Sequence, residues 1–186
     1  QAIQARSGLD LIDQEIVPAL DAVGERFEKK TLFLPQLLMS AEAAKAAFEV
    51  IKSHLHGEED TQRSRLTIVI ATVKGDVHDI GKNIVKVLLE NYGFRVIDLG
   101  KDVPPETVLE AVKRENAQLV GLSALMTTMV NMRETIQLLR QEVPHVKVMV
   151  GGAVLTQEYA DSIGANFYGK DAMASVRYAT KLAENL

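Results

Sequence analysis

Residues 66–83 read LTIVIATVKGDVHDIGKN. The stretch begins as a continuous run of apolar and β-branched residues, which is typical of a strand buried on both faces of a parallel sheet. In the loop that follows, three polar residues lie between Gly75 and Gly81. They are Asp76, His78 and Asp79. We expect the glycines to allow a tight turn and a close approach of the backbone to a bound group. His78 can offer one ring nitrogen to a metal while Asp76 holds the other.

Other kinds of site fit this loop less well. A phosphate-binding loop needs four residues between its glycines, whereas five separate Gly75 from Gly81, and Asn83 stands where the magnesium-binding hydroxyl belongs. A response-regulator domain keeps its reactive aspartate at the end of the third strand, where this sequence has Ser123. A solvated loop histidine with no ligand role is the remaining alternative for His78.

Composition indicates a soluble globular protein of one moderate domain or two small ones, with 186 residues, 47% apolar and 25% charged. The absence of cysteine excludes disulfides, thiolate zinc sites and cysteine-held iron–sulfur clusters. No run approaches the roughly 20 apolar residues of a membrane span, and no signal peptide is visible, so we expect a cytoplasmic protein without a membrane partner. A net charge of −4 gives no basic surface for nucleic acid. Because the chain does not begin with Met, we expect a fragment or a processed form.

The N-terminal part is predicted to be helical and acidic. Residues 1–60 hold 11 acidic and 6 basic side chains. An apolar stripe at steps of four, four, three and four predicts a helix, in which Pro18 causes a kink or marks the first turn: Ile12, Ile16, Leu20, Val23 and Phe27. A second helix is expected over 33–54, and a charged linker follows. We therefore predict a helical cap domain at 1–57, a linker at 58–65 and a second domain at 66–186; a helical hairpin packed for stability alone is the alternative for the first.

Strands and helices alternate in the second domain. Strands are predicted at 66–73, 95–99, 119–123, 146–150 and 165–168, and helices near 82–92, 105–115, 129–142, 156–163 and 171–184. This pattern favours an α/β fold with a doubly wound five-stranded parallel sheet, flavodoxin-like or Rossmann-like, with strand order 2-1-3-4-5. In that order ligands bind at the carboxyl ends of strands one and three, which would bring His78 beside Ser123. The fourth strand ends in Gly151-Gly152, where missing side chains leave room for a flat group.

Three motifs in this order resemble the signature of a known family. They are Asp76-x-His78-x-x-Gly81, then Ser123-x-Leu125 with Ser123 42 positions after Gly81, then Gly151-Gly152. Together they resemble the cobalamin-binding domain shared by methionine synthase and the methanogen and acetogen corrinoid proteins. Residues 23–27 (VGERF) and 33–35 (FLP) are similar to the helical cap of the same methyl-transfer family. The resemblance covers nearly the whole chain.

The resemblance implies a bound cobalamin or related corrinoid, as methylcob(III)alamin or cob(I)alamin. It implies that the benzimidazole base of the cofactor leaves cobalt and is buried against Ser123 and Gly151-Gly152, and that His78 becomes the metal ligand with Asp76 on its other nitrogen. Phe27 and Leu34 would cover the upper face of the corrin. The remaining implied cofactor-binding residues are Gly75, Val77, Asp79, Ile80, Gly81, Leu125, Thr127 and Ala172.

The function implied is that of a corrinoid protein that carries a methyl group on cobalt. A substrate-specific methyltransferase would load it and a second methyltransferase would deliver it to tetrahydrofolate or a thiol, with a reductive activator as a further partner. The chain itself would be the non-catalytic corrinoid subunit, without catalytic residues. Two alternatives are a cobalamin-dependent sensor and the small domain of an adenosylcobalamin mutase. One departure concerns Met129, which stands where methionine synthase has a relay serine, so we expect the His–Asp relay to end at Asp76.

Overall fold

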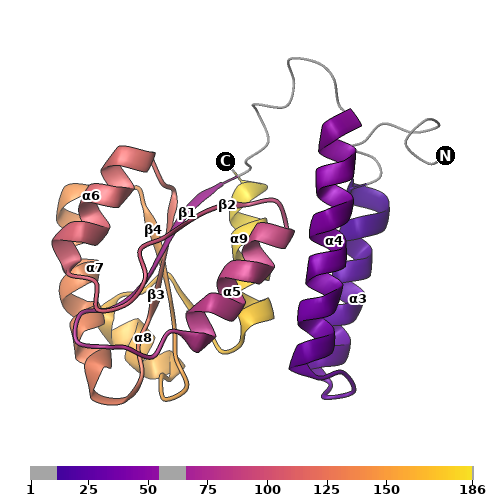
Figure 1. Cartoon of the computed structure of the whole chain (residues 1–186). Helices are drawn as coiled ribbons and strands as arrows, with labels where there is room; N and C mark the ends of the chain where they lie inside the picture. Colours follow the sequence, from indigo (N-terminus) through magenta and orange to yellow (C-terminus); the bar gives the residue numbers. More distant parts are fainter. Residues whose placement is uncertain (1–11, 55–65, 186) are drawn as a thin grey trace. The chain divides into compact units, whose positions relative to one another are not determined.

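The structure, a computed structural model, describes residues 12–54 and 66–185. The predicted linker at 58–65 lies outside the described residues. The chain divides into a helical unit and a unit built on a sheet, and each is described by itself (Figure 1).

The helical unit consists of one π-helical turn and two α-helices: η1 (Ile12–Ile16), α3 (Val17–Glu28) and α4 (Leu34–His54). Pro18 lies in the first turn of α3, where its missing N–H would have had no helical partner, so the proline marks a helix start. Phe33 donates its backbone N–H to the Gln36 side chain over 2.8 Å, which caps the start of α4. Leu20 and Leu37 are buried, as expected if apolar side chains hold α3 against α4.

The sheet unit alternates strands and helices along the chain. Its elements are β1 (Thr67–Thr72), α5 (Ile80–Asn91), β2 (Arg95–Asp98), α6 (Pro105–Glu115), β3 (Leu119–Ser123), η2 (Met126–Met129), α7 (Val130–Glu142), β4 (Lys147–Gly151), α8 (Gln157–Ile163), β5 (Phe167–Gly169) and α9 (Ala172–Ala183). All paired strands are parallel and their order is β2-β1-β3-β4-β5. The predicted fold class and strand order are confirmed.

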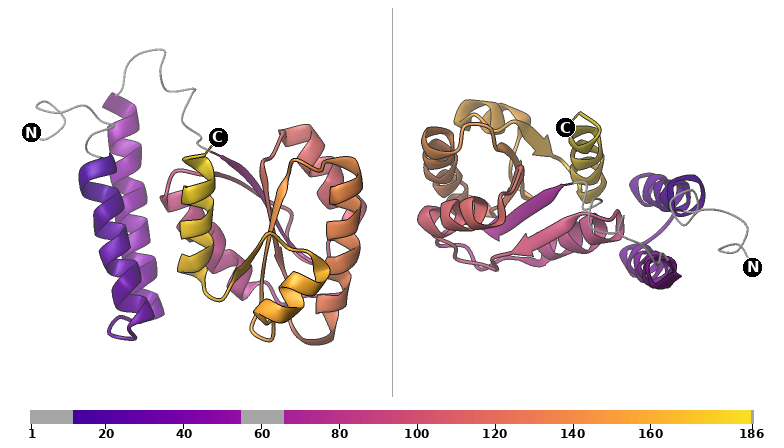
Figure 2. Two further views of the ribbon diagram at one scale, coloured as in Figure 1. Left: turned by 180° about the vertical axis from the view of Figure 1, so that it is seen from behind. Right: turned by 90° about the horizontal axis from the view of Figure 1, so that it is seen from above.

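Helices cover both faces of the sheet, with α6, α7 and α8 on one face and α5 and α9 on the other (Figures 1 and 2). Because side chains alternate along a strand, Val69, Ala71 and Val73 pack into the core that includes α6, α7 and α8. Ile68, Ile70 and Thr72 therefore point to the face covered by α5 and α9. β1 is thus buried on both faces, which explains its continuous apolar sequence.

The parallel register brings the carboxyl ends of the central strands together. Thr72 pairs with Ser123, and Ser123 pairs with Gly151. Gly152 has φ of 156°, and a Cβ there would come within 1.9 Å of the Ala124 carbonyl oxygen. Only glycine permits this approach, so the second glycine of the pair lets the loop after β4 lie directly against the loop after β3.

Candidate functional site

His78 lies in the loop between β1 and α5 with its side chain 63% exposed. Its Nδ1 is 2.9 Å from Oδ1 of Asp76, a residue that is 1% exposed. A carboxylate only accepts hydrogen bonds, so Nδ1 carries the proton of the neutral ring and Nε2 keeps its lone pair. The described residues contain no group of three or more His, Cys, Asp or Glu that could hold a metal ion. His78 is thus suited to a metal that is already held by a cofactor, because such a metal needs only one further ligand from the protein.

The Asp76 carboxylate accepts four hydrogen bonds. Oδ1 receives the backbone N–H of His78 over 2.8 Å as well as the His78 ring, while Oδ2 receives the Leu125 N–H over 2.6 Å and the Thr128 hydroxyl. Burial raises the pKa of this carboxyl, but the hydrogen bonds from Thr128, Leu125 and His78 outweigh burial and lower the pKa to about 2. Asp76 is therefore charged at neutral pH and fixes the orientation of the His78 ring.

The hydrogen-bond network does not end at Asp76. The expected relay position is Met129, which has no hydroxyl, but Thr128 one position earlier places its hydroxyl on Asp76. The chain turns here in the short helix η2. Because of this turn, the side chain that faces the loop after β1 is that of Thr128 and not that of Met129. The two adjacent threonines, Thr127 and Thr128, were the only hint in the sequence.

The turn before Asp76 is held from two sides. Asp102, in the loop after β2, accepts the Gly75 N–H with its Oδ1 over 2.7 Å and donates its own N–H to the Asp76 carbonyl over 2.9 Å. Asn131, near the start of α7, donates its side-chain amide to the Lys74 carbonyl over 2.6 Å. Gly75 adopts φ of 81°, as the predicted tight turn requires, and Asp102 adopts φ of 55°. No pattern in the sequence indicates either polar contact.

We expect Asp102→Gly to loosen this turn without straining the chain. Glycine adopts positive φ freely, so the substitution removes only the acceptor of the Gly75 N–H. Losing a hydrogen bond worth about 1 kcal/mol should speed amide exchange at Gly75 roughly fivefold. Asp102→Asn keeps an acceptor oxygen and tolerates this backbone, so it is the matched control and should exchange as the wild type does. Hydrogen exchange followed by NMR measures both; an unchanged rate in Asp102→Gly would contradict the assignment.

A buried ion pair fixes the start of α5. Lys82 is 4% exposed, and its Nζ lies 2.6 Å from Oδ1 of Asp98 at the end of β2. A cation in the first turn of a helix is disfavoured by the helix dipole, so the carboxylate compensates it. Burial raises the pKa of Asp98, but hydrogen bonds from Lys82 and Gly100 and the charge of Lys82 lower it overall. Lys82 therefore anchors the first turn of α5 to the end of β2.

Large apolar side chains are exposed around His78. Val77 is 58% exposed and Ile80 is 76% exposed, and Val130 and Val154, which follow the ends of β3 and β4, are also exposed. All four lie in segments that follow the carboxyl ends of β1, β3 and β4. The predicted tight turn at Gly81 is wrong, because α5 already begins at Ile80 and Gly81 is helical. A Cβ at Gly81 would meet nothing within 4 Å.

The other predicted site residues are spread over both units. Ser123 ends β3, Leu125 follows it, Gly151-Gly152 end β4, and Ala172 opens α9. Thr127 lies in η2, but its side chain lies outside the described part of the chain. Phe27 and Leu34 are half-buried residues of α3 and α4 in the helical unit. The sheet thus brings the first group to one edge, and the roles of Phe27 and Leu34 stay predictions.

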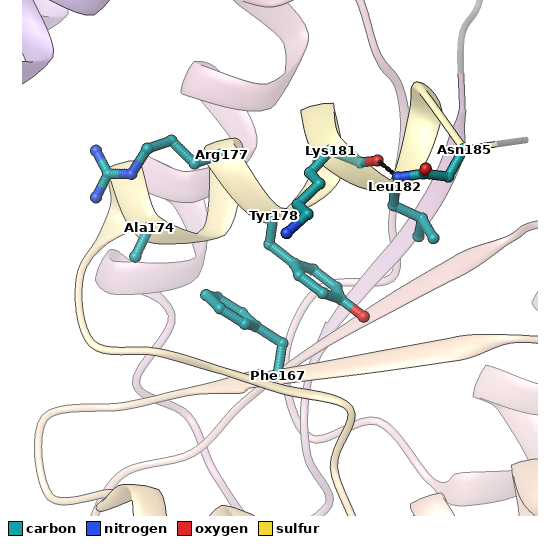
Figure 3. A pocket seen from close by; sticks show the side chains of 7 residues that line it. All are labelled: Phe167, Ala174, Arg177, Tyr178, Lys181, Leu182 and Asn185. Atoms are coloured by element: carbon teal, nitrogen blue, oxygen red, sulfur yellow. Dashed lines mark hydrogen bonds between the residues drawn. The ribbon is translucent and has the colours of Figure 1, made fainter.

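A surface hollow lies elsewhere, along the carboxyl-terminal half of α9 (Figure 3). Its floor contains Phe167 and Tyr178, whose rings stack with centroids 4.3 Å apart and planes at 6°. Because α9 runs back from the carboxyl edge of the sheet, this hollow is separate from the loops that carry His78 and Ser123.

Comparison with known proteins identifies the family. Residues 66–177 match the B12 binding domain, and residues 1–52 match a second family also described as a B12 binding domain. The chain belongs to the B12-binding corrinoid proteins. It is 46% identical over 167 residues to the trimethylamine corrinoid protein 1 of Methanosarcina mazei. The aligned region covers 88% of this chain and 77% of that protein. It is 42% identical over 185 residues to the dimethylamine corrinoid protein 1 of the same organism. That alignment covers 98% of this chain and 85% of the relative.

Solved structures of B12-binding proteins share both the sequence and the fold. A cobalamin-binding protein from Desulfitobacterium hafniense is 34% identical with a TM-score of 0.83, covering 94% of this chain and 82% of that one. The methanol:cobalamin methyltransferase complex of Methanosarcina barkeri contains a chain that is 32% identical with a TM-score of 0.80, covering 99% and 72%. Within the described residues of this corrinoid protein, no helix is both long and apolar enough to cross a membrane.

Proposed function

We propose that this corrinoid protein carries a methyl group between two methyltransferases. The observation that carries the proposal is the His78–Asp76 pair, in which an exposed imidazole keeps the lone pair of Nε2 while a buried carboxylate holds Nδ1. The names of the relatives support it, since those proteins are trimethylamine and dimethylamine corrinoid proteins. When bound, the corrinoid supplies a cobalt centre that can accept a methyl group and release it.

In this proposal the residues of the chain bind and orient the cofactor. His78 would coordinate cobalt through Nε2, and Asp76 would keep the Nδ1 proton in place. The loop around them would meet the lower face of the corrin through Gly75, Val77, Asp79, Ile80 and Gly81. The nucleotide tail would lie against Ser123, Leu125, Thr127, Gly151, Gly152 and Ala172. Phe27 and Leu34 would cover the upper face and keep water and oxidants away from the reacting centre.

We propose domain boundaries at 1–57 and 66–186 with a linker at 58–65, and methylamines as the methyl donors. Two relatives support this donor class, since they are 46% and 42% identical and are named for trimethylamine and dimethylamine. A substrate-specific methyltransferase would be the first partner. Delivery to tetrahydrofolate or a thiol by a second methyltransferase, a reductive activator and a cytoplasmic location stay predictions.

The test begins with the chain reconstituted with hydroxocobalamin. We expect one cofactor per chain, with nitrogen superhyperfine coupling in the electron paramagnetic resonance spectrum of the cobalt(II) state. Labelling only the protein histidines with nitrogen-15 should turn the coupling pattern from triplets into doublets. The reduced protein should then be methylated by trimethylamine or dimethylamine in the presence of the matching methyltransferase. An unchanged coupling pattern would show that the cofactor's own base is the ligand and would contradict the role of His78.

A further inference from the structure

Tyr159 connects α8 to the turn that follows β3. Its phenolic O–H donates a hydrogen bond to the Met129 carbonyl over 3.0 Å. The backbone of Tyr159 is fixed at the start of α8, because its N–H is donated to the Thr156 side chain over 3.2 Å. The half-buried ring packs against the apolar core that includes residues of α6, α7 and α8. The body of the sheet unit therefore holds the hydroxyl in place.

The carbonyl that Tyr159 holds lies at the end of η2. A single turn of 3₁₀ helix makes few hydrogen bonds of its own, with poorer geometry than those of an α-helix, so contacts from outside determine its position. The N–H of Leu125, which precedes η2, and the hydroxyl of Thr128 both go to Asp76. The turn is thus tied to Asp76 and, through its last residue, to α8.

The Met129 carbonyl can accept the phenol without losing another hydrogen bond. Met129 is the residue that precedes α7, a position whose carbonyl oxygen accepts the first hydrogen bond of the helix. A carbonyl oxygen has two lone pairs, so the phenol takes the second. Removing the phenol O–H would therefore leave the start of α7 intact and would remove the tie between η2 and α8.

Tyr168 of β5 offers a close comparison. Its O–H donates to the Leu155 carbonyl over 2.7 Å, in the loop after β4, and its half-buried ring packs against the same core. Both tyrosines thus hold a backbone carbonyl beyond the carboxyl end of a strand. Of the two carbonyls, the one held by Tyr159 belongs to η2, whose Thr128 donates to Asp76.

We infer that Tyr159 is a positioning residue for the His78 imidazole. Its hydroxyl fixes η2, and η2 aims the donors of Leu125 and Thr128 at Asp76. Asp76 in turn holds Nδ1 of the histidine. The inference rests on the proposed function, because coordination of cobalt is what gives the orientation of the imidazole a consequence.

The first test uses the free chain with nitrogen-15 in its histidines, at about pH 8.5, where a histidine ring is ordinarily neutral. The two ring nitrogens of His78, identified by their loss in His78→Gly, should give well separated signals, because Asp76 fixes the proton on Nδ1. Tyr159→Phe keeps the ring that packs against the core. It should bring the two signals closer together, since a less well held carboxylate allows the other tautomer.

Amide exchange provides a second reading of the same free chain. Exchange at Leu125, whose N–H goes to Asp76, should rise roughly two- to fivefold in Tyr159→Phe. Exchange at Val69, inside β1, reports the stability of the sheet and should stay as in the wild type.

Tyr168→Phe is the matched control, because it removes a phenol O–H from the same kind of bond. It should leave the His78 signals and the Leu125 exchange rate as in the wild type. Wild-type behaviour of Tyr159→Phe at either reporter, or the same changes in Tyr168→Phe, would overturn the inference.

The second test uses the chain reconstituted with hydroxocobalamin. Tyr159→Phe should raise the cobalt(II)/(I) midpoint potential, since a loosely held imidazole would stabilise cobalt(II) less, and Tyr168→Phe should leave it unchanged. A wild-type potential in Tyr159→Phe would overturn the inference. If labelled histidine in the wild type gave no coupling to cobalt(II), the proposed function would fail, while the measurements on the free chain would still decide whether Tyr159 orients His78.

Discussion

His78→Gly should raise the cobalt(II)/(I) midpoint potential while the corrinoid stays bound. If His78 is the ligand, its imidazole would stabilise cobalt(II) and not cobalt(I), so its loss would favour reduction. If cobalt(II) prefers the His78-ligated form by tenfold or more, the shift is about 60 mV or larger. Retention of the cofactor is expected because the loops around Ser123 and Gly151 are separate from His78 in the sequence. Potentiometric titration followed by absorbance measures the effect.

Two controls make the His78 experiment decisive. Free imidazole should enter the space left by the missing ring and return the potential toward the wild-type value. His145 is exposed and precedes β4, at the opposite edge of the sheet, so His145→Gly should leave the potential unchanged. Identical potentials in the wild type and His78→Gly would exclude His78 as the ligand.

Asp76→Asn should destabilise the cofactor-free protein at neutral pH and much less in acid. The folded-state pKa of about 2 lies below the ordinary value of an aspartate, so ionisation of Asp76 contributes about 2 kcal/mol to the free energy of unfolding. The sign is that of a depressed carboxyl pKa. The contribution is complete above the unfolded pKa near 4 and is lost as the pH falls toward 2. Asparagine also replaces one carboxylate oxygen by an NH₂ group. This donor would face another donor, either the Leu125 N–H or the N–H groups of His78.

Urea unfolding of wild type and Asp76→Asn between pH 3 and pH 7 measures this difference. The gap between the two proteins should be widest above about pH 5 and should narrow below pH 4. Asp79→Asn, which removes a carboxylate from the same loop without touching the Asp76 hydrogen bonds, is the matched control. Thr128→Val should act like a weaker form of Asp76→Asn, because one of the four hydrogen bonds is lost, and Thr128→Ser should restore it. A constant gap across the pH range would contradict the charged, hydrogen-bonded state of Asp76.

The sheet could be predicted from sequence because its central strands, β1, β3 and β4, are largely buried. A continuous run such as 66–73 has few other stable environments in a water-soluble chain, and turn residues separate it from the helices. The order of the strands then determined which loops meet, so the neighbourhood of His78 and Ser123 followed from topology. The His78–Asp76 contact was predictable for the same reason, since both residues lie in one loop.

The contacts that support this pair could not be predicted. Thr128 reaches Asp76 because η2 is a tight 3₁₀ turn, and Asp102 reaches Gly75 because its backbone adopts positive φ. Both depend on local backbone conformations that several residue types can adopt, so no pattern in the sequence marks them. At Gly81 the sequence suggested a feature that the structure lacks. A glycine beside the His78 loop suggested a tight turn, but α5 starts one residue earlier, at Ile80, and Gly81 is part of that helix.

The donors that converge on Asp76 also bear on how the protein folds. Two of its partners, Leu125 and Thr128, lie 49 and 52 positions further along the chain. Contacts this distant require closure of a long loop, so they form only after β3 has docked beside β1. Before that event the Asp76 carboxylate lacks two of its four hydrogen-bond donors. We therefore expect the pair to become fully held only once β1 and β3 are paired, so that corrinoid binding follows the pairing of the central strands.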